Sequence, residues 1–326
     1  MKKFRIVITH KLPLVIVSTV MIVSLVLLTS HSAMGEQSQT VKYTPVPSPE
    51  VPQSIKFCGQ TINFDRQDMY ERFDREMLSL LYGHTNTQLM LKRANKYFPI
   101  MAPILKENGI PEDVLYLACI ESVLSPRALS PAKAGGIWQF MPSTGQSYGL
   151  EVNDDVDERY NLEKATAAAC RYLKNAYAKY KDWPTVMASY NAGMGRISGE
   201  LSKQQQNSSL DLFLTEETSR YVFRIMALQQ IFSDPAKYGF ILTKDQFYQP
   251  VDCEIVEVSE PISDWAAWAK KYGISYLQLR DENPWIRSNK LPNKSGKTYK
   301  IRVPKKESLN RSTGNKSIYN PKWVSR

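Results

Sequence analysis

A long helical pattern, from Met69 to about Tyr238, is the feature of this 326-residue chain that most limits its fold. Apolar residues recur at helix spacing in "DMYERFDREMLSLLYG", which ends at Gly83. An alanine-rich helix is predicted in "LEKATAAACRYLKNAYAKY", entered from Asn161. No run of alternating apolar and polar residues interrupts this part of the sequence. The sequence therefore predicts a mostly α domain.

Further helices are predicted on either side of the alanine-rich one. Residues 84–109 read as a helix capped at Asn86 or Thr87 and interrupted near Pro99 to Pro103. "PEDVLYLACIESVL" begins with a first-turn proline followed by acids and ends before the next proline. Two more helices are predicted in "PTVMASYNAG" and "TSRYVFRIMALQQIFS".

The pattern changes from Val251 to Val303. "CEIVEVSE" and "KTYKIRVP" alternate like strands, and "ISDWAAWAKKYG" and "SYLQLRDENP" lie between them with helix spacing. Such a βααβ arrangement indicates a small separate module. Its tryptophans are expected in the core rather than on a sugar-binding surface: Trp265, Trp268 and Trp285.

The N-terminus has the pattern of a secretory signal over residues 1–35. Basic residues precede the uncharged stretch "LPLVIVSTVMIVSLVLLTS", and small residues follow up to Gly35. The stretch approaches the ~20 residues that span a membrane, so an uncleaved anchor is the alternative. No cysteine lies between it and Cys58, so the acceptor for a bacterial lipoprotein anchor is missing, and the proline-rich residues 36–54 read as a spacer. We expect export, to the periplasm or the cell envelope.

Export places the cysteines in a compartment where disulfides persist. Cys119 and Cys170 lie in apolar helical stretches and are expected as buried thiols, whereas Cys58 and Cys253 flank the central region and leave a bridge open. Beyond the targeting segment, His84 is the only histidine, in a stretch typical of a loop. A zinc site of histidines or a Ser-His-Asp triad would need more, and neither metal nor cofactor is predicted.

The net charge of +10 is concentrated near the C-terminus. Lysine and arginine are frequent from Arg287 to Arg326, where Glu307 is the only acid. A basic tail over residues 305–326 favours an anionic envelope polymer or a membrane surface as partner, and export makes nucleic acid a poor candidate. The alternative is a solvated, partly disordered tail. The sequence identifies no protein partner.

One carboxylate stands in an otherwise apolar helix. Residues from Val114 to Ile120 are apolar on nearly every face, and Glu121 follows in the last turn. Desolvation and the negative end of the helix dipole both raise the pKa of this carboxyl, and no basic residue stands at helical spacing to oppose them. A carboxyl that stays protonated near neutral pH suits a general acid. The alternative is a helix-end glutamate turned to solvent.

Two later segments supply groups that suit a sugar-binding groove. "SPRALSPAKAGGIWQFMPST" places Trp138 and Gln139 after two glycines, and "SYNAG" places Tyr190 and Asn191 before a glycine. Rings stack on the apolar faces of sugars while amides and hydroxyls bind their polar groups. Taken alone, each segment also fits a helix-packing turn with buried aromatics.

Three ordered blocks resemble the signature of the soluble lytic transglycosylase domain, in the lysozyme-like superfamily. They are "ES" at Glu121, "SPAKAGGIWQFMPST" from Ser130 and "ASYNAG" from Ala188. The flanks "LMLKRANKYFP", "GIPEDVLYLA", "VDERYNLEKATAAACRYL" and "ETSRYVFRIMA" are similar to the membrane-bound lytic murein transglycosylase D group. The resemblance runs roughly from Ile55 to Tyr238 and implies a lysozyme-like α-helical catalytic domain over residues 55–240.

The resemblance implies cleavage of the MurNAc-GlcNAc β-1,4 bond of peptidoglycan glycan strands without water, in cell-wall remodelling. Glu121 would first protonate the glycosidic oxygen and then accept the proton of the muramoyl 6-hydroxyl, which closes to a 1,6-anhydro end. The other positions that match the family's site are a hydrogen-bonding group beside the acid, groove residues and a hydrophobic wall: Tyr190 and Asn191, Ser130 and Gln139, and Met141.

Residues 251–304 resemble LysM, a small βααβ domain that binds N-acetylglucosamine polymers. "KYGISYLQLRDENP" and "KTYKIRVP" carry the likeness, while "SEPISDW" departs from the family's usual opening. The fold is thus expected, and sugar binding by the module stays open.

The spacing of acids separates a transglycosylase from a hydrolase. Hydrolytic glycosidases usually need two carboxyls, and none lies between Glu121 and Glu151. The cluster of Asp154, Asp155, Asp157 and Glu158 is expected to form a capped, solvated loop. A hydrolytic muramidase and a non-catalytic peptidoglycan-binding scaffold remain the alternatives.

Overall fold

The computed structural model describes residues 47–314 and 316–325. The predicted signal or anchor over residues 1–35 lies outside these ranges, as does most of the spacer. In the described part of the chain, no helix is both long and apolar enough to span a bilayer. The predicted domain boundaries stay predictions.

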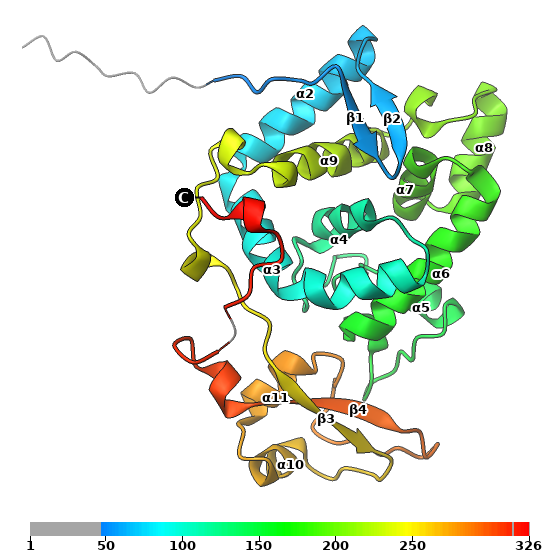
Figure 1. Cartoon of the computed structure of the whole chain (residues 1–326). Helices are drawn as coiled ribbons and strands as arrows, with labels where there is room; N and C mark the ends of the chain where they lie inside the picture. The colour runs from blue at the N-terminus through cyan, green and yellow to red at the C-terminus, as the bar shows by residue number, and fades with distance from the viewer. Residues whose placement is uncertain (1–46, 315, 326) are drawn as a thin grey trace, which may run out of the picture. The chain divides into compact units, whose positions relative to one another are not determined.

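Two long helices begin the helical region (Figure 1). Helix α2 spans Gln67–Tyr82 and α3 spans His84–Glu107. The predicted interruption of α3 is wrong, because the helix continues through both of its prolines while Phe98 and Met101 on either side of the first are fully buried. The helix cap predicted at Asn86 or Thr87 is wrong, and so is the loop predicted around His84. His84 is the first residue of α3, and the buried Thr87 hydroxyl instead donates to the carbonyl of Leu80 at 2.6 Å.

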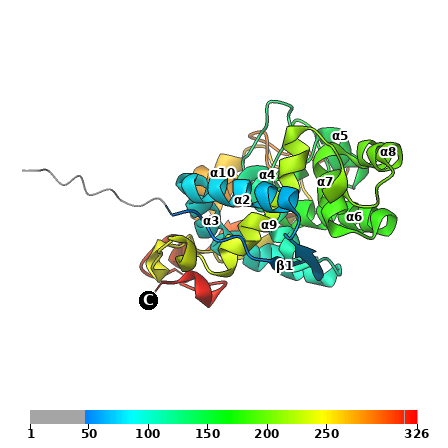
Figure 2. The same ribbon diagram turned by 90° about the horizontal axis from the view of Figure 1, so that it is seen from above.

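Helix α9 is largely buried among other helices of this region. Helix α9 contacts α2, α4 and α7, and both views show α2 lying along it (Figure 1 and Figure 2). The mostly α prediction is confirmed, although the sequence did not predict α5 and α8. The bounds are Leu115–Ser122 for α4, Pro142–Ser147 for α5, Leu162–Tyr180 for α6, Trp183–Ala192 for α7, Met194–Gln204 for α8 and Glu216–Ser233 for α9.

A short hairpin precedes α2 and was missed by the sequence analysis. Strands β1 (Ser54–Phe57) and β2 (Gln60–Asn63) pair antiparallel. The two turn residues, Cys58 and Gly59, have φ angles of 49° and 80°, as the favoured two-residue hairpin turns require. The side chain of Asp113, which precedes α4, accepts the Cys58 N–H at 2.5 Å. The hairpin is therefore fastened to the base of the helix that carries Glu121.

The C-terminal module has the predicted βααβ order. Strands β3 (Cys253–Val258) and β4 (Tyr299–Pro304) pair antiparallel, and α10 (Trp265–Lys271) and α11 (Tyr276–Glu282) lie between them along the chain. The predicted core position of the tryptophans is confirmed, because all three are at most 8% exposed: Trp265, Trp268 and Trp285.

Backbone hydrogen bonds and an ion pair join the module to the helical region. The N–H of Asp157 donates to the carbonyl of Trp285 at 2.9 Å, and that of Arg287 to the carbonyl of Asp155 at 2.9 Å. Arg302 pairs with Glu163 at 2.9 Å. Two basic residues of the C-terminal region, Arg287 and Arg302, thus form contacts within the protein.

The end of the C-terminal segment packs against α3 and α9 through Tyr319 and Trp323, so the alternative of a solvated, partly disordered tail is wrong for this part of it. Trp323 is 1% exposed, contacts the rings of Phe98 and Phe232, and donates its indole N–H to the Phe232 carbonyl at 2.8 Å. Asn95 of α3 accepts the N–H of Tyr319 at 2.8 Å. The buried ring of Trp323 thus attaches this basic segment to the helical region.

The thiols of the chain are all free. Cys119 and Cys170 are buried, as predicted. Cys58 and Cys253 also carry free thiols, so the bridge that the sequence left open is absent from this structure.

Candidate active site

Helix α4 delivers Glu121 to the surface of the core. The helix is fully buried through Leu117, Ala118 and Cys119, and the chain turns sharply after Ser122. Val123 has a φ angle of 54°, a rare conformation for a β-branched residue and one that costs about 1–3 kcal/mol. The Val123 carbonyl accepts a hydrogen bond from Arg93 of α3 at 2.9 Å, which holds the turn in place.

Close packing at Gly136 fixes the loop that follows α4. Ser122 donates its hydroxyl to the carbonyl of Ile137 at 2.9 Å. Gly136 has a φ angle of 77°, and a Cβ atom there would lie 1.9 Å from the carbonyl oxygen of Arg159. The Arg159 guanidinium in turn donates to the carbonyls of Lys133 and Phe140 at 2.7 and 2.9 Å. The loop is therefore built as a rigid support rather than a mobile flap.

The Glu121 carboxyl is set up to hold a proton near neutral pH. Burial raises the pKa of Glu121 to about 7, the hydrogen bond from the Tyr221 hydroxyl opposes that rise, and the charge of Glu217 adds to it. No ion pair with a lysine, arginine or histidine forms at Glu121 in the described residues. The predicted upward shift is confirmed.

The carboxyl opens into a cleft of about 440 Å³, within the size range of ligand sites. One wall comes from α9, where residues three and four apart share a face. The sequence analysis expected no second acid beside Glu121, but α9 places Glu216 and Glu217 in this cleft. The cleft is lined by Ile120, Glu121, Asn191, Glu216, Glu217, Arg220, Tyr221 and Arg224.

Two predicted site residues lie at the end of α7. Asn191 lines the cleft, accepts the hydroxyl of Thr218 at 2.8 Å and donates to Glu217 at 3.4 Å. Tyr190 donates its hydroxyl to the carbonyl of Trp138 at 2.8 Å rather than to Glu121. Its pKa is raised well above the usual value by burial and, secondly, by the charge of Glu121.

The other predicted site residues belong to the loop between α4 and α5. Ser130 accepts the N–H of Ala134 at 3.0 Å, and Gln139 donates its amide to the Gly136 carbonyl at 2.7 Å. Met141 is 42% exposed and precedes α5. None of Ser130, Gln139 and Met141 lines the cleft with Glu121, so their role in a groove stays a prediction.

Two segments of the chain match known family models. Residues 99–213, which include Glu121 and its supporting loop, match the model of the transglycosylase SLT domain. The chain carries a transglycosylase SLT domain. Residues 254–307 match the soluble lytic transglycosylase C-terminal LysM-like domain.

Relatives with curated names agree with the SLT domain. The chain is 32% identical over 222 residues to membrane-bound lytic murein transglycosylase D of Escherichia coli strain K12, and equally to that of E. coli O6:H1 strain CFT073. The match covers 66% of this chain and 48% of each relative, so the chain spans about half their length.

Two solved structures are also similar in part. The 70 kDa soluble lytic transglycosylase of E. coli matches with a TM-score of 0.39 and 22% identity, over 52% of this chain and 29% of that one. An inactive mutant of the lytic transglycosylase Slt from Pseudomonas aeruginosa matches with a TM-score of 0.38 and 18% identity, over 51% of this chain and 28% of that one.

The acid cluster matches the predicted capped, solvated loop only in part: Asp154 is exposed and the Asp157 side chain caps the short helix that follows, but Asp157 and Glu158 are buried. Asp157 is 6% exposed and holds Arg159 at 2.7 Å, while Glu158 is 2% exposed. Glu158 pairs with Lys164 and, at 3.1 Å, with Lys297 of the LysM-like module. These acids are structural, and neither lines the cleft with Glu121.

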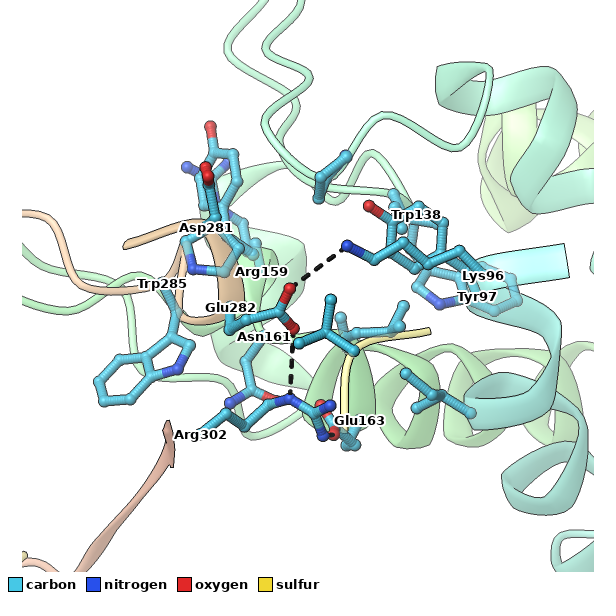
Figure 3. A pocket seen from close by; sticks show the side chains of 18 of the residues that line it. Lys96, Tyr97, Trp138, Arg159, Asn161, Glu163, Asp281, Glu282, Trp285 and Arg302 are labelled. Carbon is cyan, nitrogen blue, oxygen red and sulfur yellow. Dashed lines mark hydrogen bonds and ion pairs between the residues drawn. The ribbon is translucent and has the colours of Figure 1, made fainter. Parts of the chain in front are cut away.

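A second cavity lies where the SLT domain meets the LysM-like module (Figure 3). Its centre is Glu282, which contacts Lys96 at 3.3 Å and Arg302 at 3.8 Å, as the dashed lines of Figure 3 mark. The open space is about 50 Å³, which holds a few water molecules but not a sugar ring. The cavity is therefore part of the joint and not a second substrate site.

Tyr221 is the functional residue that the sequence analysis missed. It is 5% exposed on α9, and its hydroxyl reaches Glu121 across 100 residues of sequence. The block "ETSRYVFRIMA" was noted as a likeness of the family, but nothing in its local pattern sets this tyrosine apart from the apolar residues around it.

Proposed function

We propose that this chain is a peptidoglycan lytic transglycosylase, an exported enzyme that cleaves the MurNAc-GlcNAc β-1,4 bond of murein. The observation that carries the proposal is Glu121, an acid with a pKa of about 7 that lies in the segment matched by the SLT model and opens into a cleft whose other wall is α9. An acid poised near the working pH is the best compromise between holding and releasing a proton.

In the first step, the Glu121 carboxyl donates its proton to the glycosidic oxygen. The bond between that oxygen and the muramoyl anomeric carbon breaks, the GlcNAc hydroxyl leaves, and positive charge develops on the muramoyl ring. The new Glu121 carboxylate is the charge that can stabilise the developing cation. The Tyr221 hydroxyl donates to the same carboxyl and supports its ionised state.

In the second step, the same carboxylate takes the proton of the muramoyl 6-hydroxyl. That oxygen bonds to the anomeric carbon, which yields a 1,6-anhydro end and returns Glu121 to its protonated form. No water is consumed and no second acid is needed. Glu121 alone thus supplies the acid and the base.

The proposal is tested by digesting purified sacculi and identifying the new glycan ends by mass spectrometry. Anhydromuramoyl ends, lighter by one water than reducing ends, are expected from the wild-type protein. Glu121→Gln should release neither product while it still sediments with sacculi. A Glu121→Gln variant that cleaves at the wild-type rate would remove Glu121 from the mechanism.

A hydrolytic muramidase is the second candidate, and Glu217 is the observation that favours it. This carboxylate lines the cleft with Glu121, as a base that activates water would have to do. Reducing muramoyl ends that disappear in Glu217→Gln would assign the protein to that class. A non-catalytic wall-binding scaffold, the third possibility, would leave sacculi intact and bind them equally with either glutamate replaced.

The partner of the protein in this proposal is the glycan strand, and the site of action is the cell envelope. The curated relatives are described as membrane-bound, which fits an N-terminal anchor over residues 1–35 as well as a cleaved signal.

A further inference from the structure

We propose that Arg220 and Arg224 form a carboxylate-binding site in the cleft, which engages the stem peptide carried by the muramoyl residue at the cleavage point. The inference rests on the proposed function and adds a substrate preference to it. The enzyme would favour glycan strands that bear peptides over strands that have been stripped of them.

A buried carboxylate holds both arginines. Glu76 of α2 is 0% exposed, and its two oxygens accept the Nε–H groups of Arg220 at 2.6 Å and of Arg224 at 3.0 Å. Arg75 donates to Glu76 from the other side at 3.3 Å. Because the guanidinium groups are fixed by Glu76, little further side-chain entropy is lost when a ligand binds them.

The outer edges of the two guanidinium groups remain open. Within the described residues, neither terminal nitrogen of Arg224 has a hydrogen-bond partner, and Arg220 uses only one, at 3.4 Å from Glu76. The Arg220 and Arg224 side chains are 28% and 35% exposed, and both line the cleft that holds Glu121. Planar N–H edges of this kind match a carboxylate.

The charges around the pair restrict where an anion can bind. Two arginines share the single negative charge of Glu76, so these three groups together carry one net positive charge. Of the two other acids of the cleft, Glu216 pairs with Arg75 at 2.9 Å and its charge also acts on Arg220, while Glu217 accepts from the neutral amide of Asn191 at 3.4 Å. The charge of Glu217 acts on Glu121, so an anion is least repelled at the open edges of the two guanidinium groups.

The substrate chemistry identifies the anion. The sugar rings of murein are neutral, and the carboxylates belong to the peptide on the lactyl group of the muramoyl residue. That residue is the one whose anomeric carbon reacts beside Glu121. A cation pair in the same cleft is therefore positioned for the peptide of the reacting unit rather than for its sugars.

The test compares two substrates in one mixture, intact peptide-bearing strands and peptide-free strands. The peptide-free strands are prepared with an amidase, and the lactyl carboxylates that the amidase exposes are then converted to neutral amides, so that no anion remains on the muramoyl residue. We measure the ratio of the initial cleavage rates for the wild-type protein and for Arg224→Gln. Losing a charge-assisted, bidentate contact should lower the peptide-bearing to peptide-free ratio by about tenfold. Arg224→Lys, which keeps the charge without the planar fork, should recover part of it.

Arg66→Gln is the control, because Arg66 is an exposed arginine that pairs with Asp68 and Asp211 and does not line the cleft. It should leave the ratio unchanged. An unchanged ratio in Arg224→Gln, or an equal drop in Arg66→Gln, overturns the inference. Anhydromuramoyl ends from peptide-free strands would show that the proposed function stands even then.

Binding in the Glu121→Gln background gives a second readout that does not depend on turnover. Arg224→Gln should weaken the affinity for a peptide-bearing oligosaccharide by about tenfold and thereby bring it close to that for the peptide-free chain. Equal affinities of the Glu121→Gln protein for the two oligosaccharides, with arginines intact, would overturn the inference.

Discussion

Replacing Glu121 by glutamine should stabilise the protein, and should do so only as the pH rises. Burial raises the pKa of Glu121 from an ordinary value of 4.5 to about 7. The folded state therefore binds this proton more tightly than the unfolded state does. Its contribution to stability is fully present below about pH 4.5 and is lost as the pH rises through about 7.

The size of the effect follows from the two pKa values. Each pKa unit corresponds to about 1.4 kcal/mol, so the difference between 4.5 and about 7 is worth about 3 kcal/mol. Glutamine has nearly the same shape and does not titrate. The free energy of unfolding of Glu121→Gln, relative to wild type, should therefore grow by about 3 kcal/mol between about pH 4.5 and pH 8.

Denaturant unfolding of both proteins over this pH range is the assay. All other titrating groups are common to the pair and cancel in the difference. Parallel stability curves, with the same offset at about pH 5 and about pH 8, would refute the account. They would mean that the pKa of Glu121 is the same in the folded and unfolded chains, so that folding does not favour its protonated form.

Three further substitutions test the supports of the site. Tyr221→Phe removes a hydrogen bond that favours the Glu121 carboxylate, so the limb of the kcat/KM profile that falls with rising pH should move up by about one pH unit; an unmoved limb contradicts this. Gly136→Ala should lower the free energy of unfolding by about 3 kcal/mol or more, because its Cβ meets the Arg159 carbonyl, while Gly195→Ala, where space is open, is the neutral control in the same melts. Trp323→Ala should cost about 3–5 kcal/mol in denaturant unfolding, and a change within error would show that the C-terminal segment adds nothing.

Local patterns predicted most of the helices and the burial of Glu121 because both depend on near neighbours. The apolar stretch that forms α4 is continuous in sequence and ends next to Glu121. The burial of Glu121 and the direction of its pKa shift could therefore be predicted from the sequence. The βααβ module was predictable for the same reason. Its strands alternate and its helices keep their spacing within a short segment.

The misses share a long-range cause. Tyr221, Glu217 and the arginine pair reach the cleft from α9, which lies far from Glu121 in sequence. Two of the four acids predicted as solvated are buried in ion pairs, Asp157 with Arg159 and Glu158 with Lys164 and with Lys297 of the module. Local periodicity carries no information on such pairings, which are fixed only when helices pack.

The most direct test of the central claim, that Glu121 completes both steps without water, is digestion of sacculi in water enriched in the heavy oxygen isotope. Mass spectrometry then follows the new muramoyl ends. The account predicts anhydromuramoyl ends that contain no heavy oxygen. New reducing ends would contradict it, because each must take its anomeric oxygen from water and would therefore carry one heavy oxygen atom.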